Sequence, residues 1–228
     1  MRRIPSVAEF ATQRSDMVER QLRRRGIVDE RVLDAMEAVP RERFVPEAYR
    51  RRAYADSALP IGYGQTISQP WIVAAICEGL ALQGDETVLE VGTGSGYSAA
   101  VIAQLAREVA TIERVDELAA AARRTLAELG IGKVEVIVGD GSAGLPERAA
   151  FEAIAVHATA PSPPPTLIAQ LAPGGRLVAP IASTSADMLT VFRRLGDEVD
   201  PETGRGLESR VIGPCRFVPL IGSEGFPE

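Results

Sequence analysis

The chain has 228 residues, of which 46% are hydrophobic and 25% charged, and its formal net charge is −6. This balance is typical of a globular protein large enough to bury a substantial core. The acidic total argues against sequence-independent nucleic-acid binding, because that depends on neutralising phosphates. Two cysteines, Cys77 and Cys215, lie far apart without metal-ligand spacing, which argues against a disulfide framework or a zinc site.

The sequence also lacks the signals of membrane insertion and export. No apolar run approaches the length of a membrane span. The mixed segment after Met1, which contains Glu9 and Arg14, is unlike a signal peptide. We therefore expect a cytoplasmic protein with no membrane partner. We also expect the protein to be a monomer.

Residues 1–60 are predicted to form a helical cover over a core of residues 61–228, within a single domain. Gly26 ends the first predicted helix, Asp29 caps the second and Pro40 ends it. The apolar residues at helical spacing are Met17, Leu22, Val32, Leu33, Met36 and Val39.

Strand and helix patterns alternate from residue 86 onward, and this alternation predicts an α/β fold with a largely parallel central sheet. The predicted strands are 87–91, 108–112, 134–138, 151–156 and 175–181, followed by 188–194 and 211–218. Only a turn-rich segment separates the last two, so we expect an antiparallel C-terminal edge.

A glycine-rich loop, residues 92–96, follows the first of these strands, where open parallel sheets bind ligands. A dinucleotide loop would follow G-x-G-x-x-G, whereas this one is G-x-G-x-G with Glu90 ahead of it. A carboxylate there suits a sulfonium ligand with an ammonium group better than a pyrophosphate. A phosphate-binding P-loop is excluded, since no Gly-Lys-Ser/Thr follows, and a plain turn without a ligand is the remaining alternative.

Two further acidic residues end the next strands. Glu113 lies 19 residues after Gly94 (113 − 94 = 19), where a carboxylate can accept both hydroxyls of a ribose. Asp140, between two glycines after the third strand, could accept a hydrogen bond from an adenine amino group. A solvated charge and an ordinary turn residue are the alternatives for these two positions.

Residues 60–70 combine glycines, hydroxyls and amides ahead of Pro70, which suits the first turn of a helix. Ser68 is then either a helix cap or part of a functional site.

Several segments together resemble the protein-L-isoaspartate O-methyltransferase family. Residues 65–70 (Gln-Thr-Ile-Ser-Gln-Pro) are the most specific to it, and 39–46, 88–97, 139–141 and 173–177 extend the likeness over most of the chain. The resemblance implies a Rossmann-like methyltransferase fold and S-adenosylmethionine as methyl donor, with S-adenosylhomocysteine as product and no metal. It also implies that isoaspartyl-containing proteins and peptides are the substrates, methylated on the free α-carboxylate.

The family likeness also implies roles for individual residues. By this resemblance, Ser68 would be the catalytic residue. The substrate cleft would be lined by Gln65, Thr66 and Ile67. The cofactor would be bound by Glu90, Gly92, Thr93, Gly94, Ser95, Gly96, Glu113, Asp140 and Gly141.

The sequence departs from the family pattern after the fourth strand. His157 stands where the family has a small residue or threonine, at the edge of the sheet that binds ligands. We assign it to the substrate cleft, with a strand-end residue without function as the alternative. The proline-rich residues 161–165 follow it and bear on peptide preference.

A carboxylate acceptor is ionised near neutral pH, so no general base is needed, and the site has only to orient and partly desolvate it. Three rival functions remain. They are a related methyltransferase acting on an aspartate of one dedicated peptide, a module that binds the cofactor without chemistry, and an NAD-dependent oxidoreductase, which the glycine spacing disfavours.

Overall fold

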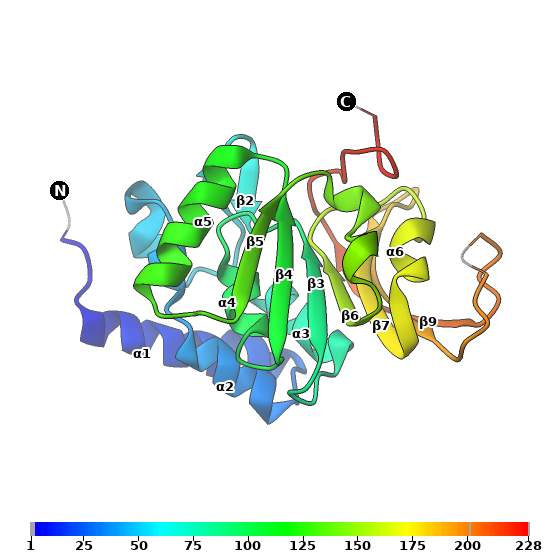
Figure 1. The fold of residues 1–228 in the computed structure, drawn as a ribbon. Helices are drawn as coiled ribbons and strands as arrows, with labels where there is room; N and C mark the ends of the chain where they lie inside the picture. Colours follow the sequence, from blue (N-terminus) through cyan, green and yellow to red (C-terminus); the bar gives the residue numbers. More distant parts are fainter. Residues whose placement is uncertain (1–2, 201, 228) are drawn as a thin grey trace.

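The computed structural model describes residues 3–200 and 202–227, and within them seven strands form one sheet in the order β5-β4-β3-β6-β7-β8-β9 (Figure 1). The strands are β3 (Thr87–Val91), β4 (Glu108–Glu113), β5 (Val134–Val138), β6 (Phe151–Val156), β7 (Leu171–Ile181), β8 (Asp187–Arg194) and β9 (Leu207–Cys215). The first five are parallel, and β8 pairs antiparallel with both β7 and β9. The predicted α/β class and the antiparallel edge are confirmed.

The C-terminal strand predicted at 211–218 is displaced in the structure, where β9 spans Leu207–Cys215. The chain after β9 leaves the edge of the sheet and returns to the end of β6, where the main-chain N–H of Thr159 donates to the Val218 carbonyl. Apolar residues 217–218 therefore belong to this returning segment and not to a strand.

Two hydrophobic clusters cover the two faces of the sheet. The first contains residues of the N-terminal segment and of α3 (Pro70–Leu80), α4 (Tyr97–Ile102) and α5 (Asp116–Glu128); the second packs under α6 (Pro165–Ala169). Val88 belongs to the first cluster, and Leu89 and Val91 belong to the second. Because side chains alternate along a strand, Glu90 faces the α3 and α4 side.

The N-terminal segment is helical, as predicted, and its helices α1 and α2 lie across the lower left of the view in Figure 1. It comprises α1 (Val7–Met17), a π-helical turn (Val18–Leu22), a 3₁₀ turn (Arg23–Arg25) ended by Gly26, α2 (Glu30–Ala38) capped by Asp29, and 3₁₀ turns at Arg41–Phe44 and Glu47–Arg52. Its apolar residues share the first cluster with the strands, so the helices add directly to the core.

A hairpin connects this segment to the sheet. Strands β1 (Leu59–Gly62) and β2 (Gln65–Ile67) pair antiparallel around Tyr63 and Gly64, both with positive φ. The hairpin ends at Ile67 and α3 begins at Pro70, so only residues 68–69 connect the two.

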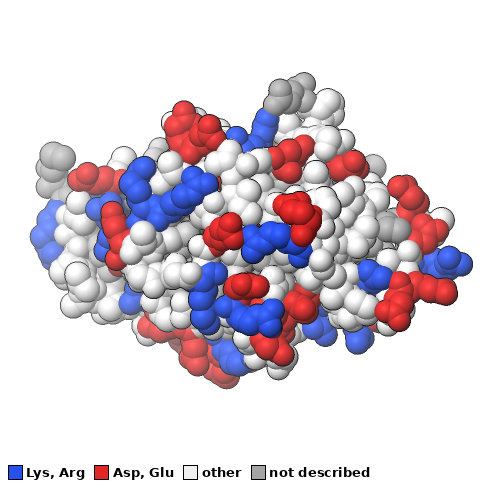
Figure 2. All heavy atoms as spheres, viewed as in Figure 1, with Lys and Arg blue, Asp and Glu red and all other residues white. Residues whose placement is uncertain are grey.

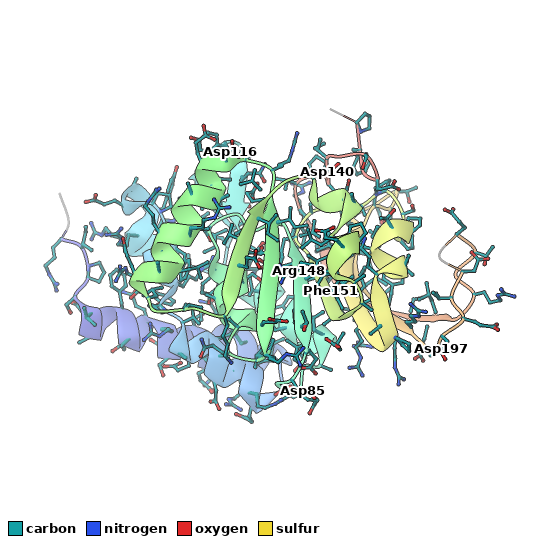
Figure 3. All side chains as sticks on the ribbon, in the orientation of Figure 1. Asp85, Asp116, Asp140, Arg148, Phe151 and Asp197 are labelled. Carbon is teal, nitrogen blue, oxygen red and sulfur yellow. The ribbon has the colours of Figure 1, made fainter. Side chains whose placement is uncertain are left out.

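Asp140 and Asp116 follow the carboxyl ends of β5 and β4 and lie at one edge of the sheet, whereas Asp85, which precedes β3, lies at the opposite edge (Figure 3). Acidic and basic side chains intermingle over the face shown in Figure 2, as on an ordinary solvated surface. None of the described helices has both the length and the apolar character that a membrane crossing requires.

Candidate active site

A cavity of about 690 Å³ lies at the carboxyl-terminal edge of the parallel strands. This volume is within the range of small-molecule sites. The cavity is lined by many of the predicted site residues, namely Gln65, Thr66, Ile67, Ser68, Gly92, Thr93, Gly94, Ser95, Glu113, Gly141 and His157. The structure therefore joins the hairpin segment to the glycine loop, although the two are about 25 residues apart in sequence.

The glycines of the loop differ in what they permit. Gly92, Gly94 and Gly96 all have positive φ, of 96°, 53° and 85°. A Cβ on Gly96 would lie 3.1 Å from the Ala122 Cβ of α5, so this glycine allows helix packing, and it is not part of the cavity lining. Gly96 was predicted to bind the cofactor; in the structure it packs against α5, and a ligand contact at this position stays a prediction.

Glu113 ends β4 with its carboxylate fixed in place. Its Oε2 accepts from the Gly94 N–H at 2.8 Å and its Oε1 from the Val115 N–H at 3.0 Å. The residue is only 6% exposed and lines the cavity. Since each carboxylate oxygen has a second lone pair, Glu113 can also accept hydrogen bonds from ligand hydroxyls.

Glu90 occupies a different position from the one predicted. It has no exposed surface and is not part of the cavity lining. Its Oε2 accepts from the Thr111 hydroxyl at 2.6 Å, and its Oε1 lies 3.3 Å from Nε2 of His157. Because β3 turns this side chain toward α3 and α4, Glu90 does not line the cavity, and its contact with a cofactor ammonium group stays a prediction.

Asp140 lines a smaller hollow beside the main cavity, together with Arg114 and Ile221, which border both. Its Oδ1 accepts from the N–H and the hydroxyl of Ser142, and its Oδ2 accepts from the N–H of Ser223. Burial favours the neutral acid, but these hydrogen bonds prevail and lower the pKa of Asp140. The carboxylate therefore fastens the C-terminal segment at the rim of the cavity.

Ser68 lies on the cavity wall directly after β2. The alternative assignment of Ser68 as a helix cap is wrong, because Gln69 is the N-cap of α3, no side chain caps it, and Pro70 begins the helix. The Ser68 side chain therefore has no structural capping role.

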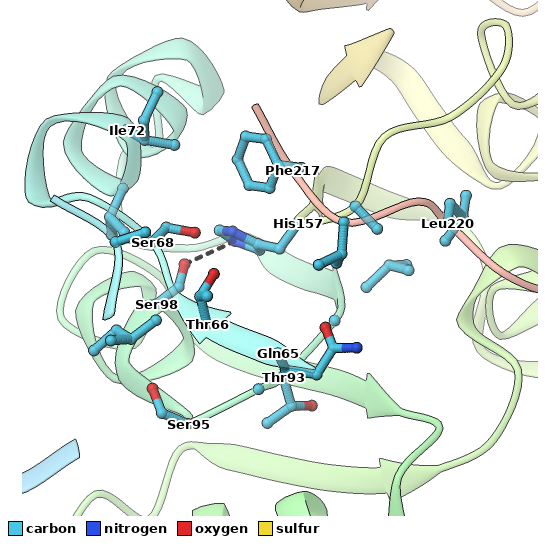
Figure 4. Close-up of a pocket in the computed structure, with 18 of the residues that line it drawn as sticks. Gln65, Thr66, Ser68, Ile72, Thr93, Ser95, Ser98, His157, Phe217 and Leu220 are labelled. Atoms are coloured by element: carbon cyan, nitrogen blue, oxygen red, sulfur yellow. Dashed lines mark hydrogen bonds between the residues drawn. The ribbon is translucent and has the colours of Figure 1, made fainter. Parts of the chain in front are cut away.

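His157 follows β6 and borders the same cavity. Figure 4 shows its ring between Ser68, Ser98 and Phe217, with a hydrogen bond of 2.8 Å between Nε2 and the Ser98 hydroxyl. The ring centroid lies 6.3 Å from that of Phe217. His157 thus borders the cavity, and its assignment to the substrate cleft stays a prediction.

Part of the lining was missed from the sequence. The end of β9 and the returning C-terminal segment together supply residues 214–221, and α4 supplies Ser98. A polar residue in the first turn of an otherwise apolar helix was the available signal for Ser98. Among the described residues, no group of three or more His, Cys, Asp or Glu is placed to hold a metal ion.

The family model for protein-L-isoaspartate(D-aspartate) O-methyltransferase matches residues 12–225. The protein-L-isoaspartate O-methyltransferase of Koribacter versatilis (strain Ellin345) is 50% identical over 97% of this chain and 96% of its own length. Protein-L-isoaspartate O-methyltransferase 1 of Rhodopseudomonas palustris (strain HaA2) is 53% identical over 95% of this chain and 86% of its own.

Solved structures give the same result. A protein-L-isoaspartate O-methyltransferase structure superposes with a TM-score of 0.78 at 28% identity, covering 93% of this chain and 67% of the other. A Plasmodium falciparum structure, determined in complex with S-adenosyl-L-homocysteine, has the same fold, with a TM-score of 0.76 at 24% identity over 91% of this chain and 98% of its own. The chain belongs to the protein-L-isoaspartate(D-aspartate) O-methyltransferase family.

Proposed function

We propose that this protein transfers a methyl group from S-adenosylmethionine to the free α-carboxylate of L-isoaspartyl residues in damaged proteins and peptides. The observation that carries the proposal is the single cavity that unites the glycine loop and Glu113 with residues 65–68. A site for a nucleoside and a site rich in hydroxyl and amide groups are thereby open to each other.

The residues present fit the methyl donor. Gly92 and Gly94 expose main chain without a Cβ, and Glu113 presents a fixed carboxylate for ribose hydroxyls. Ser95 and Gly141 border the same space. S-adenosylmethionine, when bound, supplies an electrophilic methyl group on a sulfonium.

The acceptor side needs positioning and not proton removal. A carboxyl group with a pKa near 4 is already ionised at neutral pH, so no general base takes part. The Ser68 and Thr66 hydroxyls line the cavity and can donate hydrogen bonds to one oxygen of the acceptor while the other attacks. Enclosure between the hairpin and the C-terminal segment removes part of the carboxylate's hydration.

The product is a methyl ester, whose alkoxy group leaves more readily than a carboxylate oxygen. The neighbouring main-chain amide then closes a succinimide and releases methanol, and hydrolysis of the ring returns part of the residue to aspartate. Only the transfer requires this protein. We propose further that it acts in the cytoplasm as a monomer, on peptides and proteins and not on nucleic acid, in keeping with its acidic net charge.

The test is incubation with methyl-labelled S-adenosylmethionine and two N-acetylated peptides that differ only in Asp or L-isoAsp at one position. Base-labile label on the isoAsp peptide alone is the expected result. Binding of the donor without label on either peptide would contradict the proposal and favour the methyltransferase for one dedicated peptide.

A further inference from the structure

The mouth of the cavity carries an arginine with no partner among residues 3–200 and 202–227. Arg216 directly follows β9, borders the cavity and is exposed to solvent. Within those residues its guanidinium has no hydrogen-bond, ion-pair or ring partner. An arginine side chain is always charged in proteins, so a full positive charge is available here to a ligand.

Arg216 lies on the acceptor side of the cavity. The ring centroid of the next residue, Phe217, is 6.3 Å from that of His157, and Figure 4 shows both rings on the side of Ser68. The same segment reaches the donor side only farther along the chain, at Ile221, which also borders the smaller hollow. A peptide that brings its carboxylate to Ser68 therefore passes close to Arg216.

The nearby aspartates do not cancel this charge. Asp56, which accepts a hydrogen bond of 2.7 Å from the cavity-lining amide of Gln69, is already paired with Arg25 at 3.0 Å. Asp187 on β8 accepts a hydrogen bond of 2.7 Å from a threonine hydroxyl, and neither aspartate lines the cavity.

The net charge of the chain has little influence at this distance. The formal charge of −6 is spread over 228 residues, and charges farther away than a Debye length of about 8 Å are largely screened at physiological ionic strength. The charge that a peptide meets at the acceptor side of the mouth is therefore set mainly by Arg216.

The size of the cavity decides which part of a peptide meets Arg216. A volume of about 690 Å³ is that of a site for one drug-sized ligand. With S-adenosylmethionine on the donor side, the acceptor side has room for the isoaspartyl carboxylate, and the residues before and after it lie at the mouth. A carboxylate on one of these neighbours can pair with a guanidinium, whereas an ammonium group is repelled by it.

We propose that Arg216 is a specificity-determining residue, which makes isoaspartyl sites with an acidic neighbour better substrates than sites with a basic neighbour. The inference rests on the proposed function and adds a charge preference to it. The preference is modest, because a solvent-exposed ion pair contributes little free energy.

The first experiment compares three N-acetylated, C-amidated peptides that have Glu, Gln or Lys on both sides of one L-isoAsp and are otherwise identical. KM for the Glu peptide should be about threefold to fivefold below that for the Gln peptide, and KM for the Lys peptide should be higher by a similar factor. Raising sodium chloride from about 0.05 M to about 0.5 M should bring the three values together.

Two variants and a control then assign the preference to one side chain. In Arg216→Gln the three KM values should converge, and in Arg216→Glu their order should reverse, so that the Lys peptide has the lowest KM. Damage to the fold does not produce a reversal. Arg210→Gln, which changes an exposed arginine of β9 outside the cavity, should keep the order of the unmodified protein.

Equal KM values for the three peptides with the unmodified protein would overturn the inference and leave the proposed function intact. A rise in KM by the same factor for all three peptides in Arg216→Gln would also overturn it, because Arg216 would then pair with the acceptor carboxylate that the peptides share. Absence of transfer to every isoaspartyl peptide, with the donor still bound, would instead overturn the proposed function, and this inference with it.

Discussion

The side chain of Arg41 donates a hydrogen bond of 2.7 Å to the main-chain carbonyl of Ser68 from a position with no exposed surface. Its Nε donates to the Ala53 carbonyl at 2.7 Å, and its guanidinium carbon lies 4.9 Å from the centroid of the Tyr97 ring. Burial lowers the pKa of Arg41. One side chain thus ties the N-terminal segment to the acceptor loop and sets the position of the candidate catalytic serine.

Replacing Arg41 by Met should leave the carbonyls of Ser68 and Ala53 without a donor. We expect a loss of about 2–4 kcal/mol in the free energy of unfolding, measured by urea denaturation. Turnover should fall at least about tenfold while the Kd of S-adenosylmethionine changes by less than about twofold, because the glycine loop is untouched.

Arg43 provides the matched control two residues away. Its ion pair with Glu128 is exposed, so Arg43→Ala should cost no more than about 1 kcal/mol and leave turnover unchanged. Equal effects of the two substitutions would mean that Arg41 does not position Ser68.

Replacing Ser68 by Ala tests the catalytic assignment itself. We expect kcat for the isoaspartyl peptide to fall by about tenfold to a hundredfold, since one donor to the acceptor is lost, and the Kd of S-adenosylmethionine to stay nearly the same. Isothermal titration with the donor and a labelled-methyl assay supply the two readings. Ser183→Ala, which alters an exposed hydroxyl outside the cavity, is the control. A parallel fall in donor affinity would remove Ser68 from the acceptor site.

The sheet was largely predictable because its strands are short apolar runs separated by helices. Val134–Val138 and Phe151–Val156 agree residue for residue with the expected ranges. The last strand was placed too late, because residues 217–218 are apolar for a different reason: they pack against the end of β6 and the cavity. Periodicity alone does not distinguish a strand from an apolar segment that crosses a sheet edge.

The site was predictable at the level of strand ends but not of side-chain direction. Glu113 and Gly141 reach the cavity as expected. Glu90 does not reach the cavity, because the alternation of side chains along β3 turns it toward α3 and α4. The sequence predicts that alternate residues share a face of the strand, but it does not predict which helices cover that face. Asp140 was expected to face an adenine. In the structure it accepts a hydrogen bond from the N–H of Ser223, which lies more than 80 residues later in the chain, and no local sequence pattern indicates this contact.

Asp140 should control whether the C-terminal segment stays closed over the rim of the cavity. In Asp140→Ala the N–H of Ser223 loses its acceptor. The Ser142 hydroxyl also loses the carboxylate to which it donates, and this hydroxyl is the acceptor of the Glu224 N–H. We expect faster amide exchange at Ser223 and Glu224, read by nuclear magnetic resonance, and donor affinity weaker by about fivefold to tenfold.

The same attachment should depend on pH in a defined direction. Because the folded protein lowers the pKa of Asp140, the stabilisation is complete above the ordinary carboxyl value near 3.9 and disappears as pH falls through the lower folded value. Asp200 also accepts main-chain N–H bonds, but in a distant hairpin, so Asp200→Asn should leave exchange at Ser223 unaltered. Unchanged exchange at Ser223 in Asp140→Ala would show that other contacts hold the segment.

Gly141 packs so closely on β3 that adding one methyl group should lower the stability of the protein. A Cβ there would lie 2.7 Å from Cγ1 of Val91, inside contact distance of a buried side chain. Gly141→Ala should cost about 1–3 kcal/mol in the free energy of unfolding through overpacking, with weaker donor binding because the residue borders the cavity. Gly139→Ala, whose Cβ would meet only Ile112 Cγ2 at 3.9 Å, should cost less than about 1 kcal/mol.

A double-mutant cycle with Val91→Ala identifies the cause. Val91→Ala removes the methyl group that the new Cβ would strike, so the double variant should be more stable than the sum of the two single losses by at least about 1 kcal/mol. Strict additivity, measured by urea denaturation of all four proteins, would mean that Gly141→Ala acts through the backbone of the β5 turn and not through contact with β3.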